Sequence, residues 1–256
     1  MNDPRDFRRR LRAKEPLIGT FLKTPTSHHA EILGSIGYDF VMLDEEHAPW
    51  TRTSLDAGIL GARAYGAAPL VRIARPDANS ILAVLDDGAT GIMVPHVDTP
   101  EKAEQVVTWS RYRGGKRGAG LSRGADHGRR AGDAHYDHAD EVTTIVAMIE
   151  DYEAIERIGE ISAVEGVDAF FLGRGDLALS LSNAGSGAPS LDEAVEIAAK
   201  AVMASGRALS AVVQDVASDE AKWLTDLGVS AMMVASDHGF LRAAALAQLR
   251  AFKGAA

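Results

Sequence analysis

The chain has 256 residues, of which 46% are apolar, and it carries a formal net charge of −9 at pH 7. This length and composition are typical of one soluble globular domain, and the acidic balance argues against nucleic acid or an anionic membrane as a partner. The absence of cysteine excludes disulfide bonds, thiolate metal ligands and a cysteine nucleophile. The first residues are densely charged and no apolar run approaches the length of a membrane span, so a cytoplasmic protein is expected.

Short apolar runs recur along the chain and predict buried parallel strands, which are typically near-continuous stretches of apolar residues. The segment 1–14 comes first and is predicted to form an extra amphipathic helix, with Phe7 and Leu11 on one face. Eight predicted strands follow, over residues 18–23, 39–43, 69–73, 91–95, 144–149, 168–173, 209–213 and 230–235.

Helical patterns lie between most of these strands and carry recognisable start signals. Thr99 is placed to cap a helix that begins with Pro100, and Ser190 with Glu193 forms a capping box. Alternating strands and helices over this length predict a (β/α)8 TIM barrel that takes up residues 1–256 as a single domain. An open doubly wound sheet is the competing architecture, and the absence of a glycine-rich fingerprint after the first strand disfavours it.

The segment 111–141 fits neither element type, because it is rich in Gly, Arg, His and Asp. A connection of this length in a compact domain is usually functional or contacts a partner subunit. Asp133, His135 and His138 within it have a spacing like that of metal ligands, although a solvated loop is the favoured interpretation.

Polar residues follow several of the predicted strands, on the face where (β/α)8 enzymes build their active sites. Glu150 and Asp176 come after the fifth and sixth strands. Adjacent strands lie about 5 Å apart, so the two carboxylates can reach a common point. Carboxylates without cysteine indicate a hard divalent cation such as Mg²⁺ or Mn²⁺. The alternative is that each carboxylate caps the helix that follows it.

A histidine and a carboxylate follow the second strand. His47 comes three residues after Asp44. A carboxylate bonded to one ring nitrogen would fix the tautomer and leave the other nitrogen as a proton acceptor, so the two residues are a candidate general base. The alternative is a surface histidine beside a solvated acidic cluster. His96, after the fourth strand, is a weaker candidate for lining the same site.

Two cationic residues complete the polar set. Arg72 ends an apolar strand, so its guanidinium is expected in the mouth of the barrel, where it suits a carboxylate or an enolate oxygen. A structural ion pair with Asp44 or Glu46 is the alternative, and both can hold together. Lys23, after the first strand, is the candidate for a Schiff-base mechanism, but no apolar enclosure is evident around it.

Together these residues resemble the HpcH/HpaI family of class II, metal-dependent pyruvate aldolases, which includes 4-hydroxy-2-oxoheptanedioate and 2-dehydro-3-deoxyglucarate aldolases. The family pattern Asp-x-Glu-His-Ala-Pro is matched at 44–49, Val-Arg at 71–72 and Ile-Glu at 149–150. Two longer glycine-containing patterns are matched at 85–95 and 165–177. The order and spacing of these motifs extend over nearly the whole chain, so the set is highly specific.

The resemblance implies a role for each matched residue. Glu150 and Asp176 would bind the metal, and Arg72 would contact the oxygens of pyruvate. The backbone amides of Gly175 and Asp176 would hold the pyruvate carboxylate. The family resemblance also implies a homo-oligomer, a hexamer, with active sites near subunit contacts.

The sequence departs from the family pattern at positions that bear on specificity. Arg174 replaces a proline next to the expected carboxylate site, and Met148 replaces a glutamine. The guanidinium of Arg174 could recruit a second anionic group of the substrate, or it could pair with an acidic residue at a subunit interface. The segment that begins at Arg111 also differs from the family pattern.

The predicted function is a reversible aldolase that depends on Mg²⁺, Mn²⁺ or Co²⁺. It would cleave 4-hydroxy-2-oxo acids to pyruvate, or a related 2-oxo acid, and an aldehyde. His47, oriented by Asp44, would remove a methyl proton of pyruvate in the reverse direction. One alternative is a CoA-ester lyase of the citrate-lyase β type, for which the Asp-x-Glu-His motif has no evident use. A non-catalytic binding barrel is another, and the intact polar set argues against it.

Overall fold

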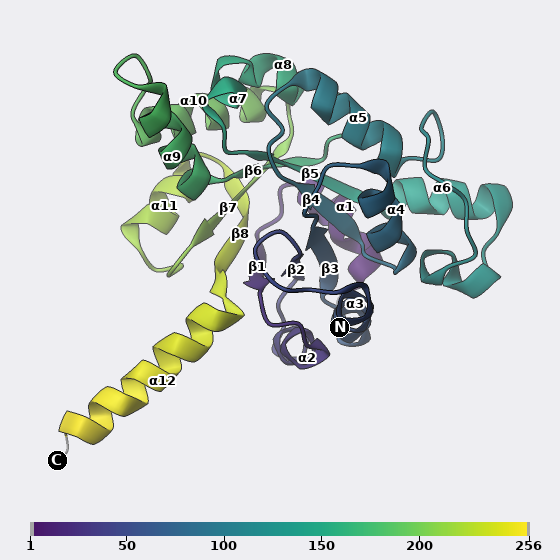
Figure 1. The fold of residues 1–256 in the computed structure, drawn as a ribbon, viewed down its shortest axis with the longest axis horizontal. Coiled ribbons are helices and arrows are strands. Elements are labelled where there is room, and N and C mark those ends of the chain that lie inside the picture. Colours follow the sequence, from purple (N-terminus) through teal and green to yellow (C-terminus); the bar gives the residue numbers. More distant parts are fainter. Residues whose placement is uncertain (1–2, 255–256) are drawn as a thin grey trace.

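Eight parallel strands close into a barrel in which each strand pairs with the next along the chain and β8 returns to pair with β1 (Figure 1). The structure is a computed structural model that describes residues 3–254. The strands are β1 (Leu17–Leu22), β2 (Phe40–Asp44), β3 (Ala68–Arg72), β4 (Gly91–Val94), β5 (Thr144–Ile149), β6 (Ala169–Leu172), β7 (Ala208–Val213) and β8 (Val229–Ser236). All of them end within one residue of the predicted bounds, and the (β/α)8 barrel is confirmed.

Helices surround the barrel (Figure 1). Two of the predicted starts are confirmed, because Thr99 accepts a hydrogen bond from the Lys102 amide and Ser190 with Glu193 forms the capping box. The helices are α1 (Phe7–Arg12), α2 (Ser27–Ser35), α3 (Arg52–Ala64), α4 (Ala78–Asp86), α5 (Pro100–Ser110), α6 (Gly132–Val142), α7 (Tyr152–Glu156), α8 (Ile158–Ala163), α9 (Arg174–Ala184), α10 (Leu191–Ala204), α11 (Asp219–Asp226) and α12 (Asp237–Gly254).

The extra N-terminal helix packs against the apolar interior of the barrel. The predicted segment forms a short 3-10 turn, Pro4–Asp6, followed by α1, while residues 1–2 lie outside the described residues. Phe7 and Leu11 are buried, and the Phe7 ring packs on Phe40 with centroids 5.2 Å apart. The Phe40 ring in turn lies against the backbone of Gly19, which leaves no room for a side chain at that position.

The segment 111–141 is more ordered than predicted, and its assignment as a long loop is wrong in its second half. It contains a 3-10 element, Arg123–Gly128, and nearly all of α6. The apolar pattern of α6 is sparse, since Ala139 and His135 are its buried residues, so the usual helical period is hard to see in the sequence. His135 is fixed by a hydrogen bond between its Nε2 and the hydroxyl of Tyr112.

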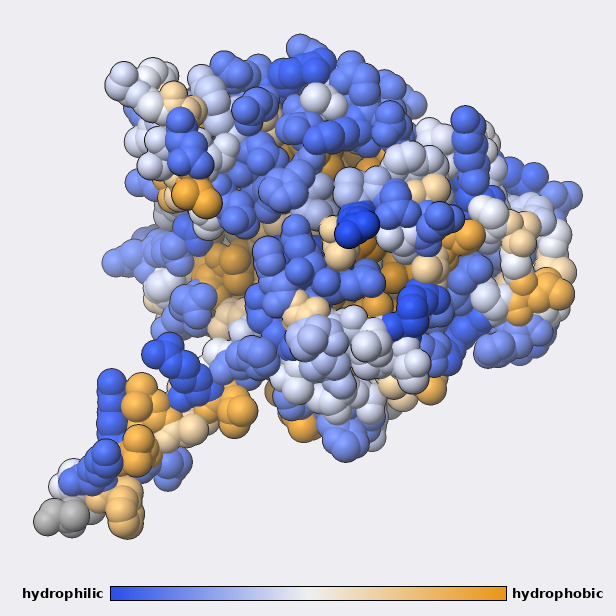
Figure 2. Space-filling model, viewed as in Figure 1, coloured by the Kyte–Doolittle hydropathy of each residue, from blue (hydrophilic) through white to orange (hydrophobic). Residues whose placement is uncertain are grey.

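The last helix leaves the barrel. In Figure 1, α12 projects from the end of β8 instead of lying along the barrel wall, and Figure 2 shows apolar side chains along it. Its exposed large apolar residues are Leu241, Leu246, Leu249 and Phe252. Within residues 3–254, the helices are all too short or too polar to cross a membrane.

Candidate active site

Asp44 and Arg72 form a buried ion pair at the carboxyl ends of β2 and β3. The two residues are register partners on adjacent strands. The guanidinium donates two parallel hydrogen bonds to the carboxylate, Nε to Oδ1 and Nη2 to Oδ2, both 2.8 Å long. The cation also lies 4.8 Å from the ring centroid of Phe21, within cation–π range. Both interactions fix the direction in which Arg72 points.

The predicted bond between Asp44 and the ring of His47 is not formed. Asp44 instead accepts a hydrogen bond from the backbone amide of His47 at 3.2 Å, and the Nζ of Lys23 lies 3.1 Å from its Oδ2. Burial alone would raise the pKa of Asp44, but hydrogen bonds from Arg72 and Lys23 hold it below its ordinary value. Asp44 is therefore a permanent anion that anchors two cations and the loop after β2.

Glu46, and not Asp44 as predicted, is the carboxylate that lies beside the ring of His47. Its Oε2 lies 3.7 Å from Nε2 of His47, whose side chain is half exposed. The same oxygen lies 3.3 Å from Nη1 of Arg72 and makes no hydrogen bond within the described chain, although it is buried. The Asp-x-Glu-His motif contains this residue, but nothing in the sequence indicates which carboxylate faces the ring.

Glu150, at the end of β5, is a buried carboxyl group among other carboxylates. It is 1% exposed, and its Oε1 accepts a 2.7 Å hydrogen bond from the backbone amide of His96. Burial raises the pKa of Glu150 to about 7, and the charges of Glu46 and Asp176 add to this, against the hydrogen bond and charge of His96. Ionised Glu150 is therefore disfavoured first by its burial and then by the two neighbouring carboxylates.

His96 joins the site from β4, as predicted. Its φ of 53° is in the left-handed region, which is uncommon for a side-chain-bearing residue and recurs at active sites. This conformation directs its amide at Glu150, while its Nδ1 lies 3.1 Å from the carboxylate of Asp151. Burial lowers the pKa of His96, but the hydrogen bond to Asp151 and the nearby glutamates raise it overall.

The turn after β6 brings the first residues of α9 over Glu150. A Cβ on Gly173 would lie 2.9 Å from Oε2 of Glu150, so the absence of a side chain allows this approach. Gly175 and Asp176 are exposed in the first turn of α9, where backbone amides lack helical partners. The alternative in which Glu150 and Asp176 cap helices is not realised, since α9 and α7 have no side-chain caps.

The predicted contact between Arg174 and substrate stays a prediction, and in the structure two of the guanidinium nitrogens bond within the chain. Nη1 donates to Oε1 of Glu220 at 2.7 Å, and Nη2 donates to the carbonyl oxygen of Val212 at 3.0 Å. These bonds connect α9 to the end of β7 and to α11. The partner is an acidic residue of the same chain, so Arg174 positions the turn that carries Gly175.

The Asp133, His135 and His138 spacing does not produce a metal site. Asp133 is ion-paired to Arg113 at 2.8 Å, and His135 is bonded to Tyr112. In the part of the chain that the structure describes, no group of three or more His, Cys, Asp or Glu side chains is arranged to hold a metal ion.

Comparison with known proteins connects this site to a family. A family model described as HpcH/HpaI aldolase/citrate lyase matches residues 17–243. The chain belongs to this family. The 2-keto-3-deoxy-L-rhamnonate aldolase of Escherichia coli O17:K52:H18 is 34% identical over 238 residues, which are 89% of this chain and 88% of the relative. The hydroxypyruvate/pyruvate aldolase of Delftia acidovorans is 34% identical over 254 residues, which are 96% and 92% of the two chains.

A solved structure supports the same assignment. An HpcH/HpaI aldolase/citrate lyase family protein from Burkholderia cenocepacia J2315 superposes with a TM-score of 0.89 at 28% identity, covering 97% of this chain and 99% of the other. The prediction that the chain is an enzyme, an aldolase of the HpcH/HpaI family, is confirmed by these relatives.

The residues of this HpcH/HpaI aldolase fit a hard divalent cation. The available donors, Glu150 and Asp176, are both carboxylates, which are the ligands that Mg²⁺ and Mn²⁺ prefer. Burial raises the pKa of Glu150, and the neighbouring carboxylates Glu46 and Asp176 raise it further. A cation at this point would relieve the repulsion among the carboxylates, and two protein ligands would leave coordination positions open for substrate.

Proposed function

We propose that the protein is a divalent-metal-dependent, reversible aldolase that cleaves 4-hydroxy-2-oxo acids to pyruvate, or a related 2-oxo acid, and an aldehyde. The observation that carries this proposal is the buried carboxyl group of Glu150, flanked by Asp176 and Glu46, at the carboxyl end of the barrel. The aldolase names of the two relatives support the reaction class. The whole chain, residues 1–256, would act as one domain, and its cytoplasmic location stays a prediction.

Glu150 and Asp176 would hold Mg²⁺, Mn²⁺ or Co²⁺. A bound metal ion of this kind supplies Lewis acidity, which makes the methyl protons of pyruvate acidic and stabilises the enolate. The free amides at Gly175 and Asp176 are suited to the substrate carboxylate, because the first turn of a helix presents N–H groups and a positive dipole end.

Arg72 would stabilise the oxygen on which negative charge develops. Three of its nitrogens are directed by Asp44 and Glu46, so the guanidinium is held in place before substrate arrives. Preorganised donors of this kind are worth more than flexible ones, because they do not reorganise during the reaction. Asp44 is a positioning residue in this account, since its carboxylate contacts Arg72 and Lys23.

His47 would move the proton between the 2-oxo acid and solvent. Its ring is exposed enough to reach a substrate, and its neutral form has one nitrogen available as acceptor. Glu46 lies on the Nε2 side and would orient the ring. This arrangement replaces the predicted His47–Asp44 unit.

We also propose that the enzyme works as a homo-oligomer, a hexamer as the family resemblance implies. The support is α12, which projects from the barrel with Phe252 77% exposed and three leucines exposed as well. A contiguous apolar surface of this kind is typical of protein interfaces. Light scattering during gel filtration tests this, and a monomer at micromolar concentration would contradict it.

Chelation separates the proposed reaction from the alternatives. EDTA should abolish the cleavage of 4-hydroxy-2-oxo acids and Mg²⁺, Mn²⁺ or Co²⁺ should restore it, while borohydride in the presence of pyruvate should leave the activity intact. A reduced pyruvate adduct on Lys23 would show a Schiff-base enzyme instead. Turnover of acyl-CoA thioesters without any cleavage of free 2-oxo acids would favour the CoA-ester lyase.

A further inference from the structure

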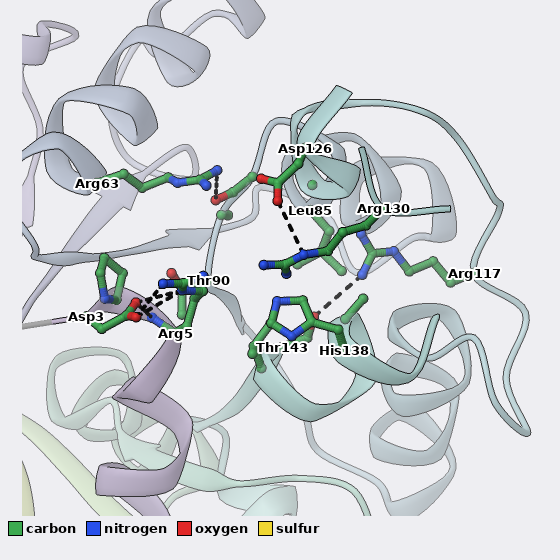
Figure 3. A pocket seen from close by; sticks show the side chains of 16 residues that line it. Asp3, Arg5, Arg63, Leu85, Thr90, Arg117, Asp126, Arg130, His138 and Thr143 are labelled. Carbon is green, nitrogen blue, oxygen red and sulfur yellow. Dashed lines mark hydrogen bonds and ion pairs between the residues drawn. The ribbon is translucent and has the colours of Figure 1, made fainter. Parts of the chain in front are cut away.

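A cationic cavity lies at the opposite end of the barrel from the active site. It has a volume of about 260 Å³ and is lined in part by Thr90 and Thr143, which directly precede β4 and β5. The catalytic residues follow the other ends of these strands. The charged groups around the cavity come from four separate segments (Figure 3), and they are Arg5, Arg63, Arg117, Arg130, Asp3 and Asp126.

Four guanidinium groups face two carboxylates in this cavity, although the chain as a whole is acidic. Arg5 is paired with Asp3 at 2.6 Å, and Arg130 lies 3.3 Å from Asp126. Asp126 is also shared with Arg129 at 3.4 Å. These pairs neutralise Arg5 and Arg130, so among the residues that line the cavity Arg63 and Arg117 have no carboxylate partner.

Arg63 is the first of the two remaining cations. Among residues 3–254 it has no carboxylate within ion-pair distance. Its Nη1 donates a long hydrogen bond, 3.5 Å, to the carbonyl oxygen of Gly88. Burial lowers the pKa of Arg63, and the charges of Arg123, Arg5 and Arg130 lower it further against Asp126. Arg63 is therefore a partly buried cation whose charge has no directly bonded carboxylate among the described residues.

Arg117 is the second of these two cations. Its side chain is 3% exposed, and its nearest carboxylate oxygen, on Asp86, is 3.6 Å from Nη2. Its Nε is buried and makes no hydrogen bond within the described chain. A buried donor without a partner is unfavourable by about 1–3 kcal/mol, so the chain itself leaves the guanidinium of Arg117 incompletely satisfied.

We propose that this cavity binds a small molecule bearing a phosphate group, with Arg63 and Arg117 as its principal contacts. Arginine is the side chain best suited to phosphate, since its fork of donors matches two oxygens at once. A phosphate dianion would balance the guanidinium of Arg63 and that of Arg117, whose Asp86 partner lies at 3.6 Å and does not line the cavity. The cavity is near the lower limit of small-molecule sites, about 300 Å³, so it has room for a phosphate and a few further atoms.

Titration calorimetry in EDTA tests the site without a metal at the active site. The probes are inorganic phosphate and glycerol 3-phosphate, with succinate as the carboxylate comparison. Wild type should bind both phosphate probes saturably and more tightly than succinate. Arg63→Met should weaken phosphate binding by about tenfold or more, as the loss of a charged hydrogen bond implies. Tighter binding of glycerol 3-phosphate would identify an ester as the ligand, and equal binding would identify free phosphate.

The matched control is Arg129→Gln, which removes the same charge from a neighbouring side chain that is 80% exposed and does not line the cavity. This variant should bind phosphate like wild type. Arg130→Gln is the second test variant and should also weaken phosphate binding. It keeps the test valid if Arg63→Met does not fold. The proposal would be overturned if wild type and both cavity variants bound phosphate equally. It would also be overturned if Arg129→Gln lost as much phosphate affinity as the cavity variants, or if wild type bound succinate more tightly than phosphate.

Discussion

Replacing Glu150 by glutamine should stabilise the metal-free protein above neutral pH. Burial among carboxylates raises the pKa of Glu150 from 4.5 to about 7 in the folded protein. In the unfolded chain Glu150 ionises near its ordinary pKa of 4.5. Between about pH 4.5 and about pH 7 the folded state therefore binds the proton of Glu150 more tightly than the unfolded state does. The free energy of unfolding of the wild type should therefore fall as the pH rises through this interval and level off above it.

The magnitude follows from the size of the pKa change. Each pKa unit is worth about 1.4 kcal/mol, so the wild type should lose about 3 kcal/mol of stability by about pH 8. Glutamine keeps the acceptor for the His96 amide and carries no charge at any pH, so Glu150→Gln should not show this loss. The variant should then be the more stable protein in EDTA at about pH 8, although it should be inactive.

Urea unfolding followed by circular dichroism measures this difference in EDTA at about pH 5 and about pH 8. Glu153→Gln is the matched control, because it makes the same chemical change at an exposed position of the helix after β5 and should leave stability unchanged. Adding Mn²⁺ should stabilise the wild type and not Glu150→Gln. A Glu150→Gln protein that is less stable than wild type at about pH 8 in EDTA would refute the assignment of Glu150 as a buried carboxyl group with a raised pKa.

Three further substitutions test the other roles. Asp44→Asn should destabilise the protein by about 3–5 kcal/mol in urea unfolding, because it leaves the buried guanidinium of Arg72 without its charge partner; a change below 1 kcal/mol would contradict the anchoring role. His47→Ala should lower kcat by about two to four orders of magnitude with no change in unfolding midpoint, and full activity would exclude His47 as the base. Arg174→Met, which removes the bond to Glu220, should lower kcat/KM equally for carboxylated and uncharged aldehydes, whereas a loss confined to the carboxylated aldehyde would show direct substrate contact.

The barrel could be predicted because its strands are buried on both faces. Such strands are continuous apolar runs whose ends are marked by the first polar residue, and each run was located to within one residue. The segment containing α6 was missed for the opposite reason. That helix buries only His135 and Ala139 and has few large apolar residues. Its order therefore depends on tertiary contacts such as the bond to Tyr112, which no local pattern encodes.

For the site, the sequence could predict which residues follow the strand ends but not which of them contact one another. The positions of Glu150 and Arg72 after their strands placed both on the catalytic face. Which carboxylate pairs with which cation depends on the register between strands, and the Asp44–Arg72 register draws Asp44 away from the ring of His47. The intrachain partner of Arg174 depends on a contact with α11, more than forty residues away in the chain, which sequence spacing does not reveal.

The exchange of pyruvate methyl protons in D₂O tests the central claim most directly, because enolisation precedes carbon–carbon bond formation and needs no acceptor aldehyde. Proton NMR should show loss of the methyl signal when enzyme and Mg²⁺ or Mn²⁺ are present, and no loss above the uncatalysed rate in EDTA or with Glu150→Gln. Exchange that proceeds at the same rate in EDTA would contradict the metal-dependent aldolase. Exchange that requires a CoA thioester would contradict it as well.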